Sequence, residues 1–274
     1  MGAGVQIPAN SSRVLDELGV LDEIRKHSVE PIDLLIRSYR GEELYKQNLH
    51  PAIQKKFHFP HLLIHRADFR RILFDEARKQ GVNVCLGACV ESIDFAASKV
   101  ELVAENSAGA GKSYTADLIL GADGEHSICR KLLLGRNDPP RSSGDIVFRL
   151  AVPAAKLAVH PSTAYLVRPP AVHAWYGQDS HAIGYQLMKD GIFNVVLTIP
   201  ETKGEATIGP QPADLDAVRA HCVDWDPNFQ HLLRSADKAL KWTLLQTNEP
   251  ETWVDKSGRF ALLVDSAHAS LPYL

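Results

Sequence analysis

Apolar and polar positions form one well-defined strand, turn and helix pattern near the middle of the chain. Residues 118–120 are a short apolar run, which is typical of a strand covered on both faces. The small residues at 121–124 end this run and favour a tight turn that holds one carboxylate. A helix is predicted over 128–134, with Ser127 or a residue just before it as its cap and Gly135 as its end. Ligands of α/β sheets bind at this carboxyl end of a strand, so the pattern marks a candidate site.

Helical and strand periodicities predict the other elements. Near the N-terminus, Asn10 or Ser11 is expected to cap a first helix that breaks at Gly19. The next elements expected are a β-hairpin in 32–49, a helix over 67–80, a strand over 82–90, and strands at 100–103 and 114–120. Between 137 and about 253, proline and glycine turns separate strands expected at 147–152, 164–167, 181–187 and 193–198, and helices at 216–222 and 229–236.

The composition is that of an ordinary globular protein. Of 274 residues, 45% are hydrophobic and 23% are charged, which argues against disordered and fibrous classes. The net charge of −3 gives no electrostatic reason to expect a nucleic acid or an anionic membrane as partner. No apolar run approaches the ~20 residues that span a bilayer, and no leader pattern is present, so a cytoplasmic protein is expected.

Two other kinds of site are considered and set aside. The three histidines within 58–65 suggest a metal, but Pro60 prevents a continuous helix and no acidic or cysteine ligand completes the set, so no metal site is predicted. Residues 111–113 mimic the end of a phosphate-binding loop, yet a strand is expected where that loop requires a helix. Cys85 and Cys89 lack metal or redox spacing and are expected to be buried apolar fillers.

The central pattern resembles a known motif. Gly121-Ala-Asp-Gly-x-x-Ser-x-x-Arg130 is similar to the "DG" motif of the flavoprotein aromatic hydroxylases, the single-component FAD-dependent monooxygenases typified by salicylate hydroxylase. His65-Arg-Ala-Asp-Phe69 resembles a second family phrase, and Asp265-Ser-Ala-His-Ala-Ser-Leu-Pro272 resembles the "GD" motif. The last match departs from the family at two positions, because Val264 replaces a glycine and Ser266 an alanine. Glycine there would let the backbone approach a cofactor closely, and valine would crowd it.

The resemblance implies an enzyme that uses FAD, NAD(P)H and O2 to hydroxylate a small aromatic substrate. It implies an α/β fold that combines an incomplete Rossmann-like FAD-binding domain with a mainly antiparallel β-sheet substrate domain. The domains expected from it are 1–31, 62–136 and 258–274 for FAD, and 32–61 and 137–257 for the substrate. The positions that match cofactor-binding residues of the family are Arg66, Val90, Asp123, Gly124, Arg130 and Asp265.

Two further residues are candidates for catalysis. His181 and Tyr185 are four apart, and therefore lie on one face of the predicted strand. The family often places a histidine and a tyrosine with this spacing against the aromatic substrate. Histidine is suited to take the proton of a phenol, and Tyr185 would either bind the substrate or orient this base. From the sequence alone, a buried structural pair is the alternative.

The resemblance begins after the family's first dinucleotide-binding segment and ends inside its last cofactor motif. The chain is therefore expected to be truncated at both ends, without the Gly-x-Gly-x-x-Gly turn that holds the pyrophosphate. A catalytically silent fragment of the family is the alternative to an active monooxygenase.

Overall fold

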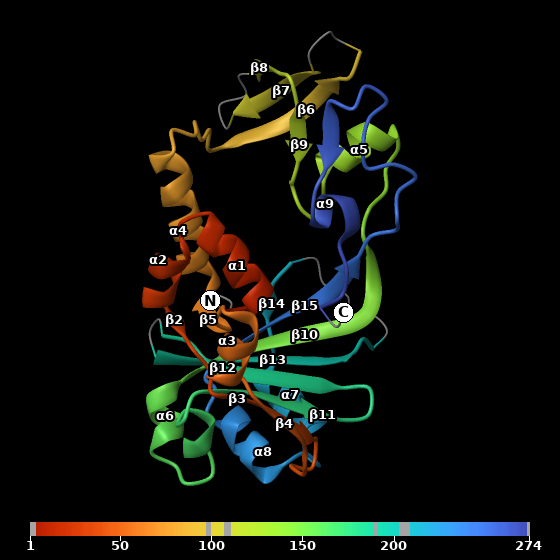
Figure 1. Ribbon diagram of the computed structural model, residues 1–274. Helices are drawn as coiled ribbons and strands as arrows, with labels where there is room; N and C mark the ends of the chain where they lie inside the picture. The colour runs from red at the N-terminus through yellow and green to blue at the C-terminus, as the bar shows by residue number, and fades with distance from the viewer. Residues whose placement is uncertain (1–3, 97–99, 107–110, 189–190, 203–208, 273–274) are drawn as a thin grey trace. The chain divides into compact units, whose positions relative to one another are not determined.

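The computed structural model describes residues 4–96, 100–106, 111–188, 191–202 and 209–272 (Figure 1). The chain divides into two compact units. The first, here called the sheet unit, comprises residues 1–82 and 145–242, and the second, the motif unit, comprises 83–144 and 243–274. The two units are defined only by how compactly their residues contact one another, and residues 1–31 and 62–82 belong to the same unit as the large sheet. The functional division into FAD and substrate domains stays a prediction.

An eight-stranded sheet dominates the sheet unit, with the strand order β14-β15-β10-β13-β12-β11-β3-β4. β3 and β11 pair in parallel, whereas β10, β13, β12 and β11 pair with one another antiparallel. The strands are β3 (Asp33–Ser38), β4 (Glu43–Asn48), β10 (Arg141–Pro153), β11 (Ala171–Tyr176), β12 (His181–Gln186), β13 (Ile192–Pro200), β14 (Gln211–Pro212) and β15 (Ala239–Gln246).

One face of this sheet carries the main hydrophobic core. Alternate residues of β10 and β13, such as Leu150 and Val195, point to this face, and both are fully buried. Trp175 of β11 packs there against Phe229, with 4.8 Å between ring centroids. Each such side chain contributes roughly 1.5–3 kcal/mol on burial. The helices that cover this face are α6 (Ala154–Ala158), α7 (Leu215–His221) and α8 (Pro227–Arg234) (Figure 1).

A smaller three-stranded sheet, in the order β1-β5-β2, completes the sheet unit. A second core cluster, which includes Ile24, Leu62 and Ile72, joins this sheet to the neighbouring helices. The elements are β1 (Gly4–Ile7), α1 (Ala9–Glu17), α2 (Leu21–Lys26), β2 (Ser28–Val29), α3 (Ala52–Phe57), β5 (Leu62–His65) and α4 (Arg66–Lys79).

The motif unit contains two small sheets. β6, β7 and β8 pair antiparallel, and β9 pairs in parallel with β16. Phe260, Leu262 and Cys129 form the buried centre of this unit. The elements are β6 (Ala88–Asp94), β7 (Val100–Asn106), β8 (Gly111–Ala116), β9 (Ile119–Gly121), α5 (Ile128–Leu134), β16 (Phe260–Leu262) and α9 (Asp265–His268).

Several elements form as expected from the sequence. The hairpin in 32–49 is β3 and β4, and Gly41 in its turn has φ 95°. The helix expected over 128–134 has those bounds, with Ser127 as its side-chain cap and Gly135 at φ 64° as its end. Gly19 also ends the first helix at φ 70°.

Other local predictions are wrong. The first helix begins at Ala9 after Pro8, and neither Asn10 nor Ser11 caps it. The strand expected at 164–167 is a 3-10 turn at Ala164–Leu166, and β11, which no prediction included, takes its place in the sheet. The strand expected over 82–90 begins only at Ala88.

Burial also corrects two expectations. Cys85 and Cys89 are exposed rather than buried, because Cys85 precedes β6 and most residues of β6, Cys89 among them, are exposed. Leu118, just before β9, and Leu120 within it have exposed fractions of 53% and 51%, so this apolar run is not covered on both faces in the described structure.

Candidate functional site

The two motif turns meet at one edge of the β9–β16 sheet. Because these strands run parallel, their carboxyl ends lie side by side. The carbonyl oxygen of Gly121, at the end of β9, accepts hydrogen bonds from the backbone N–H of Leu263 at 2.8 Å and from the hydroxyl of Ser266 at 2.5 Å. The structure therefore brings together the "DG" and "GD" segments, which are about 140 residues apart in the sequence.

Asp123 is hydrogen-bonded to the first turn of α5 and to its cap, Ser127. One carboxylate oxygen accepts the hydroxyl of Ser127 at 2.5 Å, and the other accepts the backbone N–H of Cys129 at 3.0 Å. Ser127 in turn accepts the backbone N–H of Arg130 at 2.8 Å. A negative charge at this helix end also interacts favourably with the helix dipole. Asp123 remains exposed to solvent, so its carboxylate can accept further hydrogen bonds.

The two glycines of this turn have different roles. At Gly121 a Cβ atom would lie 2.8 Å from Cβ of Cys129, so glycine is required there for packing within the protein. Gly124 has φ +84°, a conformation that favours glycine, and no protein atom lies within 4 Å of where its Cβ would be. The open side of the turn is therefore at Gly124.

Arg130 is buried, with an exposed fraction of 1%. Its Nε and Nη2 donate to Asp138 at 2.9 and 2.6 Å, and Nη2 also donates to the carbonyl of Asn248 at 2.5 Å. Nη1 donates to the carbonyls of Ser266 and Ala267 at 3.4 and 2.7 Å. All five N–H groups thus have acceptors within the motif unit, and they join α5 to α9.

Val264 has a backbone conformation that valine rarely adopts. Its φ and ψ are 55° and −130°, a region that favours glycine because a Cβ atom is crowded there. The chain thus keeps a conformation suited to the family's glycine, with a valine side chain 65% exposed. Asp265 follows at the start of α9, where it is exposed and its carboxylate makes no hydrogen bond to the described residues.

Val90 lies in the third position of β6, not near the strand's end. It is half-buried against the cluster formed by Cys129 and Phe260. The pairing of β6 with β7 shifts between Val90 and Ser92, so the backbone is irregular immediately after Val90.

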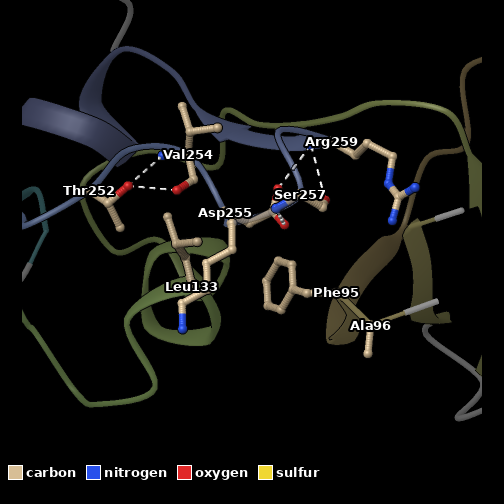
Figure 2. Close-up of a pocket in the computed structure, with 9 residues that line it drawn as sticks. Phe95, Ala96, Leu133, Thr252, Val254, Asp255, Ser257 and Arg259 are labelled. Carbon is tan, nitrogen blue, oxygen red and sulfur yellow. Dashed lines mark hydrogen bonds between the residues drawn. The ribbon is translucent and has the colours of Figure 1, made fainter. Parts of the chain in front are cut away.

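A separate hollow in the motif unit contains none of the predicted site residues. It has a volume of about 910 Å3 and lies between the end of β6, α5 and the turn that precedes β16. Figure 2 shows the ring of Phe95 and the side chain of Leu133 in this hollow, opposite a turn closed by hydrogen bonds from the Arg259 backbone to Asp255 and Ser257. Its lining is mainly apolar, and sequence patterns gave no indication of it.

In the sheet unit, His181 and Tyr185 lie on the sheet face opposite the main core. Their alternate neighbour Ala182 packs into that core, so the two candidates project from the other side. A spacing of four strand residues separates their backbones by roughly 13 Å. They therefore do not contact each other directly, and a ligand between them would meet one at each end.

The two side chains are both neutral but have opposite roles, because His181 can accept a proton and Tyr185 can donate a hydrogen bond. His181 is half-buried and its ring stacks on that of Tyr176 at 5.7 Å between centroids. Burial lowers the pKa of His181, which keeps the ring neutral and able to accept a proton at pH 7. Burial raises the pKa of Tyr185 to about 12, so Tyr185 is a neutral phenol that can donate a hydrogen bond.

Tyr185 fits closely against the first strand of the chain. A Cβ atom on Gly4 would lie 2.6 Å from Cε2 of the Tyr185 ring, so only glycine leaves room for this ring. The backbone N–H of Gly4 donates to the side-chain oxygen of Asn194 at 3.4 Å. Asn194 is the direct partner of Tyr185 in the β12–β13 pairing.

Two residues beside Tyr185 have buried donors and were not identified from the sequence. Arg149 is paired with Val196 of β13, and Asn194, two residues before Val196, is paired with Tyr185 of β12. Paired residues and alternate residues of a strand share a face, so Arg149, Asn194 and Tyr185 lie on the same face of the sheet. Nε of Arg149 and Nδ2 of Asn194 are buried and have no hydrogen-bond partner among the described residues. The guanidinium of Arg149 lies 4.7 Å from the ring centroid of Trp242.

Arg66 opens α4 and is exposed. The residue before it, His65, pairs with Gly4 and caps the helix by accepting the backbone N–H of Ala67 at 3.2 Å. The positive charge of Arg66 contributes to lowering the pKa of Arg149, after burial as the main cause. Arg66, Arg149 and Tyr185 therefore belong to one neighbourhood of the sheet unit.

A further histidine lies on the core face. His173 is fully buried, and Nη1 of Arg37 lies 3.1 Å from its Nδ1. Because arginine can only donate, Nδ1 must be the acceptor and the ring is neutral. Burial, and then the charge of Arg37, lowers the pKa of His173 to about 3. This side chain is part of the core rather than of the candidate site.

Within the described ranges, no group of three or more histidine, cysteine or acidic side chains is arranged to hold a metal ion. Nor does any helix of the described residues have the length and apolar character needed to cross a membrane.

Comparison with known proteins assigns the family. The model of a family described as "FAD binding domain" matches residues 4–214. The chain belongs to this FAD binding domain family. Several relatives are named FAD-dependent monooxygenases. It is 34% identical to the FAD-dependent monooxygenase OpS4 of Beauveria bassiana (strain ARSEF 2860), over the whole of this chain and 64% of the relative. It is 32% identical to the 3-amino-4-hydroxybenzoate 2-monooxygenase PtmB3 of Streptomyces platensis, over the whole of this chain and 65% of the relative.

The chain therefore spans slightly less than two thirds of the length of these relatives. Among solved structures, a salicylate hydroxylase substrate complex is similar with a TM-score of 0.81 and 23% identity, over 98% of this chain and 67% of that one. This likeness confirms the predicted fold, an α/β flavoprotein aromatic hydroxylase fold with mostly antiparallel sheets. The FAD cofactor is likewise supported by the family.

Proposed function

We propose that this protein carries out hydroxylation of a phenolic aromatic acid, with NAD(P)H as reductant and O2 as the source of oxygen. In this reaction one oxygen atom replaces a ring hydrogen, the other leaves as water, and NAD(P)H with one proton supplies two electrons. The observation that carries the proposal is the sheet face with His181 and Tyr185, because it presents a neutral base and a neutral hydrogen-bond donor to one ligand. Relatives named as hydroxybenzoate monooxygenases support the substrate class.

The residues of the motif unit fit the cofactor in their chemistry. Exposed carboxylates at Asp123 and Asp265 are suitable acceptors for the hydroxyl groups of a ribityl chain. Gly124 adds an open turn that a ligand can approach closely. When bound, FAD supplies the redox chemistry and the activation of oxygen. The valine at 264 is the one feature that opposes a close fit.

The other cofactor candidates would act in different ways. Arg130 has all five donors engaged within the protein, which supports a positioning role that holds the Asp265 segment in place. Arg66 is exposed and always charged, so it is suited to contact an anionic part of FAD. Val90 would contribute its backbone at the irregular position in β6.

At the substrate end, His181 would take the proton of the phenol. A phenolate has a more electron-rich ring than a phenol, so it reacts more readily with an electrophilic oxygen. Tyr185 would donate a hydrogen bond to the opposite end of the substrate, since roughly 13 Å of strand separates it from His181. This distance favours substrate binding over orientation of the base as the role of Tyr185.

A flavin titration tests the proposal first. The purified chain is titrated with FAD, desalted and examined for retained flavin absorbance, and then assayed with hydroxybenzoates, NAD(P)H and 18O2. Retained flavin and 18O in the phenolic product are expected. His181→Ala should reduce the hydroxylation rate by about a hundredfold or more, with FAD affinity unchanged. Loss of both functions together would contradict the role of His181. A silent family member would retain no flavin and incorporate no 18O.

A further inference from the structure

On the sheet face beside Tyr185, two buried hydrogen-bond donors have no partner among the described residues. Buried donors in folded proteins almost always have partners, because an unpaired one loses its hydration without compensation. Here two such donors, Nε of Arg149 and Nδ2 of Asn194, are on adjacent strands and on the same face. Their concentration at one place indicates a ligand with acceptor oxygens.

The arrangement of the two residues is fixed by the protein. Asn194 is 2% exposed, and its side-chain oxygen faces the N–H of Gly4, which sets the orientation of the amide and leaves the NH2 group as the unmatched end. The guanidinium of Arg149 is held against the ring of Trp242 at 4.7 Å. Both groups are therefore positioned before a ligand arrives, which reduces the entropy lost on binding.

The charge of the neighbourhood indicates an anion. The charge of Arg66 is close enough to contribute, after burial, to lowering the pKa of Arg149, and neither arginine forms a salt bridge within the described residues. Tyr185 adds a phenol that stays protonated. Two positive charges close to neutral donors attract an anionic acceptor, and a planar carboxylate matches the planar guanidinium best.

We propose that Arg149 and Asn194, with Tyr185, form the subsite that binds the carboxylate of an aromatic acid substrate, and so determine specificity for aromatic acids. This assignment rests on the proposed function. It orients the substrate with its carboxylate at the Arg149 end of the face and its phenol at the His181 end. Arg149 would be a residue that binds and positions the substrate.

The test is calorimetric titration of the chain with benzoate and with benzamide, which has the same shape and no charge. Wild-type protein should bind benzoate more tightly than benzamide. Arg149→Gln should weaken benzoate binding roughly tenfold to a hundredfold, the range for a hydrogen bond to a charged group, and should leave benzamide nearly unchanged. Asn194→Asp, which keeps the oxygen facing Gly4 but replaces the donor by an acceptor, should weaken benzoate by a similar factor.

Arg234→Gln is the matched control, because Arg234 is exposed on α8, which covers the other face of the sheet. It should bind both ligands as wild type does. Thermal unfolding of each variant verifies its folding, and Arg149→Lys, which keeps the charge beside Trp242, provides an intermediate if Arg149→Gln is unstable.

Three results would overturn the assignment: no benzoate binding by the wild type, equal losses for benzoate and benzamide, or variants that weaken FAD binding and leave benzoate unaffected. The last result would mean that the acceptor is an oxygen of the cofactor. Benzoate binding does not require turnover, so a chain that binds benzoate through Arg149 but incorporates no 18O would refute the proposed function and leave this assignment intact.

Discussion

Replacing Val264 by glycine should stabilise the protein. Val264 has φ 55° and ψ −130°, and a residue other than glycine in such a region costs about 1–3 kcal/mol, with β-branched residues at the upper end. Glycine would remove this cost but would lose about 0.5–1 kcal/mol through the greater freedom of the unfolded chain. The valine is 65% exposed, so the buried third of its side chain contributes only about 0.5–1 kcal/mol. The expected net gain is about 1 kcal/mol.

Urea unfolding measures this gain directly, and amide hydrogen exchange locates it. The N–H groups of Ala267 and His268 both donate to the carbonyl of Val264 at 2.9 Å, so their exchange should slow in Val264→Gly. Val264→Ala keeps the strained conformation but removes the branched Cβ, and should recover only part of the gain.

Val254 provides the matched control. It belongs to the same unit, is 45% exposed and does not have a positive φ. Val254→Gly should therefore destabilise the protein. If Val264→Gly is destabilised to the same extent, backbone strain at Val264 is not a significant term and the reasoning is wrong.

Three other outcomes are expected. Arg130→Lys keeps the positive charge but should destabilise the protein by about 1–3 kcal/mol in urea unfolding, because it leaves Asp138 and three carbonyls with too few donors; a loss below 1 kcal/mol would contradict this. Gly4→Ala should cost about 1–3 kcal/mol by forcing the Tyr185 ring to move, and an unchanged thermal midpoint would argue against the close packing. His173 has a pKa of about 3 in the folded protein, below the ordinary 6.5, so the unfolded chain binds its proton more readily. The contribution of His173 to the free energy of unfolding is therefore complete above pH 6.5 and is lost as the pH falls towards 3. The loss is up to about 1.4 kcal/mol per pH unit. His173→Phe should therefore flatten the stability profile between pH 7 and pH 5, and a profile as steep as that of the wild type would refute the assignment.

The sequence predicted elements best where local chemistry determines them. The helix α5 has its predicted bounds because its ends depend on neighbouring residues, Ser127 as an acceptor and Gly135 in a left-handed conformation. The turn at Gly41 has the same kind of local cause. In contrast, residues 164–167 are apolar and suit a strand, yet tertiary packing places them in a 3-10 turn under the sheet.

The candidate site shows the same division. That His181 and Tyr185 share a face follows from strand alternation, which the sequence contains. The contribution of Arg149 and Asn194 depends on the pairing of β10 with β13 and β12, and such register is determined by long-range contacts. Val264 was noticed as a departure from the family, but its positive φ could be measured only in the folded chain.

The carbonyl of Gly121 has a consequence for the order in which the molecule forms. Its two donors, in Leu263 and Ser266, are synthesised about 140 residues after Gly121. Between these times β10 to β15 are translated, and contacts of such long sequence separation form slowly. The motif unit is therefore expected to complete its fold only after β16 and Ser266 have been synthesised, and β9 must stay without β16 in the interval.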